Sequence, residues 1–230
     1  MKRILVASGL CFCPLLLSSC TDTPLPKATS FRQQLERVRA GETSEIIVGG
    51  EAITDDEFVL LAGIETLQKL DVANLQATAD GLKHLASAEN LEHVVFGGPS
   101  VDDAALEQLS RCSNLRVVNL PDATFSNEGL RHLTELSNLA LLRFHSKNVS
   151  NAGMQHIAEM KSVRFLHLIG VPITDDGLRV LETMTQLESF YIDDGLTTDD
   201  GIERLWKAIP GLHIHVNQEH SDRDPNRHPH

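Results

Sequence analysis

A unit of 24 residues recurs along most of this 230-residue chain and decides what the chain can fold into. Seven copies follow one another without an insertion, beginning at Ile53, Ala77, Val101, Phe125, Val149, Ile173 and Thr197. The sixth and ninth places of every copy are apolar. Because a single unit of this size cannot bury its apolar side chains alone, neighbouring copies must stack on one another.

Each copy predicts one helix and one short strand. The spacing of the sixth and ninth places is helical, whereas the eighteenth and twentieth places are apolar with one residue between them, as in a strand. These strand positions are Leu70 and Val72, Val94 and Phe96, Val118 and Leu120, Leu142 and Phe144, Leu166 and Leu168, Phe190 and Ile192, and Ile214 and Val216. The same spacing extended backwards reaches Ile46 and Val48, so we predict eight parallel strands.

The pattern Val163-x-x-Leu166-x-Leu168, followed by ITDDGL at residues 173–178, resembles the leucine-rich repeat, in the variety similar to the ribonuclease-inhibitor-like and cysteine-containing branches. The resemblance covers residues 44–217. It implies an α/β solenoid with a curved parallel sheet on the concave face and helices on the convex face. It implies little about function, because one fold serves many functions.

One departure from the family pattern concerns the turn after each strand. Many such repeats carry Asn or Cys there to satisfy backbone groups. In this chain the equivalent places hold Leu75, Pro99, Ala123, Lys147, Val171 and Gly195. We therefore expect these turns to close through other hydrogen bonds.

The N-terminus has the order of an export signal: Lys2 and Arg3, then an apolar run over residues 4–17, then small residues. The run is too short for a membrane-spanning helix, which needs about 20 apolar residues. Leu17-Ser18-Ser19-Cys20 resembles a bacterial lipobox, which implies cleavage before Cys20 and lipidation of that cysteine. In that family an aspartate after the cysteine favours the inner membrane. Thr21 stands there, so the resemblance favours the outer membrane.

The chain divides into five predicted segments. They are a signal peptide (1–19), a proline-containing tether (20–29), an N-terminal capping helix (30–42), the repeats (43–217) and a polar tail expected to be disordered (218–230). Ser30 and Gln33 form a capping-box pattern, and we expect a helix over residues 31–40 to cover the open edge of the first strand.

Charge and motifs limit the classes of function. The net charge of −12 becomes −14 when Lys2 and Arg3 leave with the signal, which argues against a nucleic-acid partner. We find no nucleophile motif, no phosphate-binding loop and no second domain that closes over a substrate. The sequence therefore predicts a binding protein with a protein partner, without catalytic residues and without a cofactor.

Pairs of carboxylates recur at the repeat spacing, at residues 55–56, 102–103, 175–176 and 199–200. A row of calcium sites is one interpretation, but the ligand spacing of known calcium loops is missing. The second place of each copy holds Thr54, Thr78, Asp102, Ser126, Ser150, Thr174 and Thr198, all of which are good helix N-caps. We therefore interpret these residues as helix caps, with acids that suit the helix dipole, and predict no metal site.

The seventeenth, nineteenth and twenty-first places point away from the helices and line the concave face. Val117, Leu141 and Phe165 share one column and form an apolar strip that the repeat does not require, since Lys69 and Ser189 share the column. The predicted binding residues are Val117, Leu141, Arg143, Phe165, His167, Tyr191 and His215. Apolar strips often mark interaction surfaces, and Arg and Tyr are enriched among binding hot spots.

These observations predict a membrane-anchored protein-interaction module of the cell envelope that binds through its concave face. Two alternatives stay open. One is a structural envelope protein without a specific ligand. The other is a metal-binding or enzymatic concave site that would use His145, His167, His213, His215 and Asp193.

Overall fold

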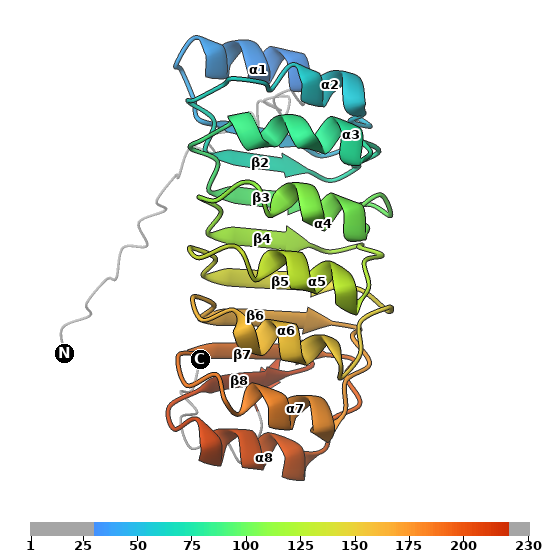
Figure 1. Ribbon diagram of the computed structural model, residues 1–230, viewed down its shortest axis with the longest axis vertical. Helices are drawn as coiled ribbons and strands as arrows, with labels where there is room; N and C mark the ends of the chain where they lie inside the picture. Colours follow the sequence, from blue (N-terminus) through green and yellow to red (C-terminus); the bar gives the residue numbers. More distant parts are fainter. Residues whose placement is uncertain (1–29, 221–230) are drawn as a thin grey trace, which may run out of the picture.

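The computed structural model describes residues 30–220 and shows one curved sheet backed along its length by a row of helices (Figure 1). The strands are β1 (Glu45–Val48), β2 (Lys69–Val72), β3 (His93–Phe96), β4 (Val117–Leu120), β5 (Leu141–His145), β6 (Phe165–Ile169), β7 (Ser189–Asp193), β8 (His213–Val216) and β9 (Glu219–His220). They lie side by side in chain order, and β1 to β8 are parallel, which confirms the predicted eight parallel strands.

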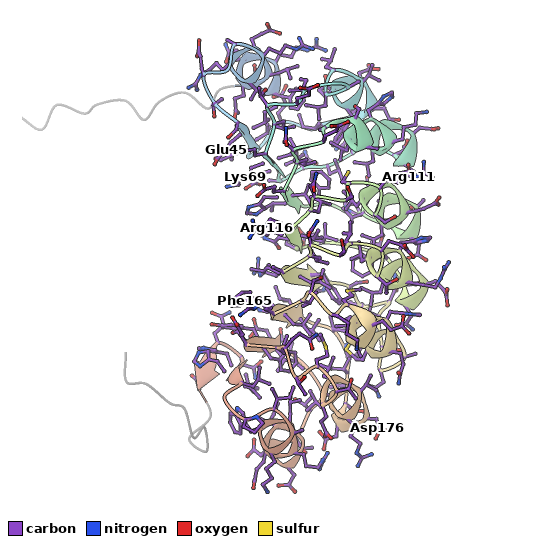
Figure 2. The ribbon with its side chains drawn as sticks, turned by 60° about the vertical axis from the view of Figure 1, so that its left-hand side comes forward. Glu45, Lys69, Arg111, Arg116, Phe165 and Asp176 are labelled. Carbon is purple, nitrogen blue, oxygen red and sulfur yellow. The ribbon has the colours of Figure 1, made fainter. Side chains whose placement is uncertain are left out.

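The helices connect successive strands and lie on one face of the sheet. They are α1 (Phe31–Arg39), α2 (Asp55–Val59), α3 (Ala79–Leu82) continued by the 3-10 helix η1 (Lys83–Ser87), α4 (Asp103–Leu109), α5 (Asn127–Leu133), α6 (Gly153–Glu159), α7 (Asp175–Leu181) and α8 (Asp199–Ala208). Figure 2 shows Arg111 and Asp176 on the helix side and Glu45, Lys69 and Phe165 on the strand side. The sheet therefore forms the concave face and the helices the convex face.

The core lies between the sheet and the helices and consists of aliphatic residues with a few phenylalanines. The predicted helix positions are buried in every copy, from Phe58 and Leu61 in the first to Ile202 and Leu205 in the last. The predicted strand positions are buried too, except Val216 in the last strand, which is only half-buried. Burial of these two sets confirms the register in which residues of one strand alternate between core and concave face.

Helix α1 closes the N-terminal end of the sheet. It begins with the predicted capping box, in which the Ser30 hydroxyl accepts from the Gln33 N–H and the Gln33 side chain accepts from the Ser30 N–H. The Gln34 side chain then bonds the outer edge of β1. Its Nε2 donates to the Ile47 carbonyl at 2.7 Å, and its Oε1 accepts from the Ile47 N–H at 2.8 Å. A side-chain amide thus takes the place of a neighbouring strand.

Consecutive copies are joined by the Asp or Asn at the third place of each copy. In five of the six junctions this side chain accepts a hydrogen bond from the second-place backbone N–H of the next copy and also bonds its hydroxyl, at 2.6–3.1 Å. The five pairs are Asp55 with Thr78, Asp103 with Ser126, Asn127 with Ser150, Asn151 with Thr174, and Asp175 with Thr198. The recurring acids therefore stabilise the next copy, a role beyond the predicted effect on their own helix dipole.

The glycine at the fifth place leaves room for this side chain. A Cβ added at Gly81, Gly129, Gly153, Gly177 or Gly201 would collide with the third-place Asp or Asn of the preceding copy. The sixth junction supports this explanation. There the third place is Ala79, and the next copy has Ala105 in place of glycine and the carboxylate of Asp102 in place of a hydroxyl.

At the last junction the contacts of Asp175 favour the ionised form of its carboxyl. The backbone N–H of Thr198, with its hydroxyl and the Arg204 guanidinium, lowers the pKa of this carboxyl below its ordinary value. A lowered pKa in the folded state means that the contact stabilises the fold above the ordinary pKa and that this contribution is lost as the pH falls through the lowered value.

Two further sets of hydrogen bonds close the loops. The turns after the strands close partly through backbone bonds to the next copy, such as Leu75 N–H to the Gly97 carbonyl at 2.8 Å, in place of the family's Asn or Cys. A ladder of asparagines, which we did not predict from the sequence, lies before the strands and not after them. Asn90, Asn114 and Asn138, at the fourteenth place of their copies, each donate to a carbonyl of the preceding copy at 2.7–3.1 Å.

The structure corrects two expectations at the level of single residues. Ser150 does not cap its helix, because α6 begins three residues later at Gly153 and Ala152 is its N-cap. The tail predicted to be disordered from residue 218 is ordered at its start. Asn217 and Gln218 both adopt positive φ, as in a tight hairpin turn, and β9 then pairs antiparallel with β8. The predicted signal, tether and Cys20, and residues 221–230, lie outside the described residues.

Neighbouring residues of β5 provide a test of the strand register. Leu142 is fully buried, whereas Arg143 faces the concave side and is half-buried. Leu142→Ala should lower the free energy of unfolding by roughly 2–5 kcal/mol, because it removes core contacts and leaves a cavity. Arg143→Ala should lower it by about 1 kcal/mol or less. Urea denaturation followed by circular dichroism measures both, and equal losses would contradict the register.

The junction between copies is tested by a double-mutant cycle. Gly129→Ala should destabilise the protein by about 1–3 kcal/mol, because the new methyl group collides with the Asp103 carboxylate. In an Asp103→Ala background the collision with the carboxylate is gone and only a tight contact with Phe125 Cβ, at 3.1 Å, is left. Gly129→Ala should then be close to neutral, since the higher helix propensity of alanine, worth up to about 1 kcal/mol, offsets that contact. Additive effects in the urea denaturation of the four proteins would argue against this packing.

Candidate functional site

The strand pairing brings the predicted binding residues together on the concave face. Val117 pairs with Leu141 and Leu141 with Phe165 across β4, β5 and β6. Asn119, Arg143, His167, Tyr191 and His215 follow one another in the next column, from β4 to β8. Six of the seven predicted residues therefore form one continuous surface over the C-terminal half of the sheet. His215 follows them in the same column but is buried, with 8% of its surface exposed, which corrects its prediction as a surface binding residue.

The apolar strip (Val117, Leu141 and Phe165) is open to solvent. Phe165 has 39% of its surface exposed, and Figure 2 shows it projecting from the strand side. Val117 and Leu141 are half-buried. The column continues as His93 on one side and Ser189 on the other, so the strip ends at polar residues at both ends. These three side chains offer apolar area that the core does not use.

Beside the strip, four side chains form a hydrogen-bonded polar chain: Asn119, Arg143, His167 and Asp193. The Arg143 guanidinium donates through Nη1 to Asn119 Oδ1 at 3.3 Å and through Nε to His167 Nδ1 at 3.1 Å. His167 Nε2 lies 2.9 Å from Asp193 Oδ2. Because Nδ1 accepts from Arg143, its lone pair is free of a proton, and the proton of the neutral ring is on Nε2. His167 therefore donates to Asp193.

Asp193 connects this polar chain to the C-terminal hairpin. Its other oxygen, Oδ1, accepts from the Gln218 N–H at 3.1 Å, and only 11% of its side chain is exposed. Asn217 Oδ1 in turn accepts from the Asp194 N–H at 2.9 Å. Sequence reasoning missed Gln218, although the Asn-Gln pair directly after the last predicted strand is compatible with a turn.

Aromatic rings extend the site towards β8. The Tyr191 ring is stacked on the His215 ring, with centroids 4.2 Å apart and an angle of 7° between the planes, and it lies 5.2 Å from the His167 ring on its other side. The Nε2 atoms of His213 and His215 lie 2.7 Å apart. Tyr191 is therefore held in a fixed orientation between two imidazoles.

The residues of the metal alternative are arranged differently from a metal site. His167 bonds Arg143 and Asp193, His213 bonds His215, and His145 lies against Gly170 two strands before Asp193. Within residues 30–220, no group of three or more His, Cys, Asp or Glu side chains is placed to hold a metal ion.

The N-terminal half of the concave face is more heavily charged and less aromatic. Glu45, Lys69 and His93 share one column there, and Asp71 lies in the next. Partial burial and the neighbouring Lys69 ammonium lower the pKa of His93, so this ring favours its neutral form. Aromatic side chains are thus concentrated on β6 to β8, whereas apolar side chains also occur in the N-terminal half, where Ile47 on β1 is 47% exposed.

Comparisons with known proteins support the fold. The chain matches no family model and no curated protein. Within the described part of the chain, no helix has the length and apolar character needed to cross a bilayer. The structure is similar to that of internalin C2 from Listeria monocytogenes str. 4b F2365, with a TM-score of 0.50 and 15% sequence identity over 75% of this chain and 80% of that chain. The chain therefore has an α/β solenoid fold like that of the leucine-rich-repeat protein internalin C2.

Proposed function

We propose that this protein is a membrane-anchored interaction module of the cell envelope, and that a partner protein docks on the C-terminal half of its concave face. The observation that carries the proposal is the apolar strip beside Arg143 and Tyr191. Apolar side chains next to arginine and tyrosine have the composition of an interface core. The net charge of −12 favours a protein partner over a nucleic acid.

The fixed geometry of the site supports binding. The Arg143 guanidinium is held by two acceptors, and the Tyr191 ring is packed between two imidazoles. Side chains that are already ordered lose little conformational entropy when a partner docks. The contacts of this surface therefore contribute more of their energy to affinity than mobile side chains would.

Anchoring by lipid on Cys20 is part of the proposal. It is supported by the lipobox-like stretch that ends at Cys20 and by the run of apolar residues before it. Thr21 favours the outer membrane over the inner membrane. Residues 21–29 span at most ~30 Å, at about 3.3 Å per residue, so the repeats would act close to the membrane surface.

Loss of binding in a concave-face variant tests the docking surface. Phe165→Asp combined with Tyr191→Ala should abolish capture of partner proteins from detergent-solubilised envelopes, because it places a charge in the apolar strip and removes the ordered ring. Affinity purification with mass spectrometry measures capture, and circular dichroism checks the fold.

The matched control is Val59→Asp combined with Leu196→Ala, since these residues are as exposed as Phe165 or more so, at 50% and 62%, and Val59 lies on helix α2. Capture should be unchanged in this control. If the folded concave-face variant recovers the same proteins as the wild type, the alternative of a structural envelope protein without a ligand on this face is favoured.

The lipid anchor is tested by Cys20→Ala. This variant should incorporate no labelled fatty acid and should leave the membrane fraction, because several acyl chains on one cysteine supply the anchoring energy. Its repeat domain should fold as in the wild type, since the described fold begins at residue 30. A processed Cys20→Ala protein that is still membrane-bound would reject the lipobox.

A further inference from the structure

Arg143 differs from the other arginines of the described residues in its partners. Ten arginines lie between residues 30 and 220, and nine of them pair with a carboxylate within 4.0 Å. The nine are Arg32, Arg37, Arg39, Arg111, Arg116, Arg131, Arg164, Arg179 and Arg204. Arg143, at the centre of the concave surface, has no such pair among the described residues.

The acceptors of Arg143 are both neutral. Asn119 is an amide, and His167 accepts through a ring nitrogen that carries no proton. A guanidinium has five N–H donors, and the two hydrogen bonds to Asn119 and His167 leave three of them without an acceptor in the described part of the chain. The positive charge of a half-buried side chain is therefore held in place but not balanced.

We propose that Arg143 binds a carboxylate of the partner, within a peptide segment that also places an apolar side chain on the apolar strip. This inference rests on the proposed function and names the chemistry of the partner. Leu141 is two residues from Arg143 on the same face of β5, and Phe165 pairs with Leu141 on the next strand. A partner peptide fits this arrangement when its carboxylate and its apolar side chain come from the same residue or from neighbouring residues.

A carboxylate suits the site better than a phosphate does. The planar guanidinium fork matches a carboxylate, and a single cation balances a single negative charge. The Asp193 carboxylate lies behind His167, and the chain as a whole carries −12, so a dianion would meet more repulsion than a monoanion. The acceptor would be an Asp or Glu side chain or a C-terminal carboxylate.

His167 and Asp193 act as positioning residues. Asp193 holds the Nε2 proton of His167, which leaves Nδ1 to accept from Arg143 Nε and orients the guanidinium plane. The Gln218 N–H holds Asp193 in turn. The C-terminal hairpin is thereby connected through the side chains of Asp193 and His167 to the proposed anchor.

Minimal probes test this chemistry without knowledge of the natural partner. N-acetyl-phenylalanine carries a carboxylate beside an apolar ring, and its carboxamide lacks only the charge. Titration of the full-length protein, followed by NMR of the arginine side-chain Nε–H groups and of the aromatic rings, should show shifts at Arg143 and Phe165. The carboxylate should bind about tenfold tighter than the amide or more, because charge-assisted fork bonds are strong.

Variants assign the effect to Arg143. Arg143→Met should weaken binding of N-acetyl-phenylalanine about ten- to hundredfold, and Arg143→Lys should give an intermediate loss, since lysine keeps the charge but not the fork. Arg131→Gln is the matched control, because it removes one positive charge from the convex helix α5 and should leave binding unchanged.

Four results would overturn the inference. The first is equal binding of the acid and the amide, and the second is unchanged binding of the acid in Arg143→Met. The third is tighter binding of phenyl phosphate than of the carboxylate. The fourth is an affinity for N-acetyl-phenylalanine that rises about tenfold or more when residues 221–230 are deleted. The last result would make the chain's own segment 221–230, with its two aspartates, the occupant.

The capture experiment separates this inference from the proposed function. If Phe165→Asp with Tyr191→Ala abolishes capture while Arg143→Met retains it in full, the carboxylate anchor is wrong and the docking surface stands. If neither variant lowers capture, the docking surface itself is wrong. Loss of capture in both, with binding of N-acetyl-phenylalanine weakened in Arg143→Met and unchanged in Arg131→Gln, supports both.

Discussion

The solenoid depends on the hydrogen bonds that one copy makes to the start of the next. The third-place Asp or Asn satisfies a backbone N–H and a hydroxyl of the following copy, and it occupies the space that the fifth-place glycine leaves open. This contact positions the next helix start, and that helix in turn covers the next strand. The contact occurs at five of the six junctions, so it recurs at the same place along most of the stack.

The junction also explains why the third place of one copy and the second and fifth places of the next copy change together. Where Ala79 replaces the acid, no carboxylate occupies the space beside the next helix, and Ala105 fits there. Asp102 then caps its own helix, with its carboxylate accepting from the Ala105 N–H at 2.9 Å. A carboxylate at position 79 would meet both the methyl group of Ala105 and the negative charge of Asp102. The differences among the copies of this one chain therefore agree with the contact.

Most of the fold could be predicted because it rests on periodicity. A residue such as Leu142 is buried because every copy buries its equivalent, and the 24-residue spacing alone places Arg143 opposite His167. Departures from the period were harder to predict. The start of α6 at Gly153 depends on local turn geometry, and β9 depends on two residues of positive φ that occur once.

The candidate site was predictable in its membership but not in its bonding. The columns placed Arg143, His167 and Tyr191 side by side, yet which nitrogen of His167 accepts is set by distances that spacing does not contain. Asp193 entered the sequence analysis only as a ligand in the metal alternative, and its partner Gln218 lay in the segment expected to be disordered. Contacts between a repeated and a unique part of a chain leave no periodic signal.

The Gln34 amide at the edge of β1 belongs to a terminal structure that is distinct from the repeated contacts along the solenoid. It bonds Ile47 of the first strand, and the hairpin at the other end bonds β7, β8 and the turn between them. Every copy between these ends contacts neighbours that are nearly equivalent to each other. A gene duplication of 24 residues within the array would therefore lengthen the concave face by one strand, about 4.8 Å, and leave both terminal structures intact. A binding surface built in this way can lengthen to fit a larger partner without any change in the structures at its two ends.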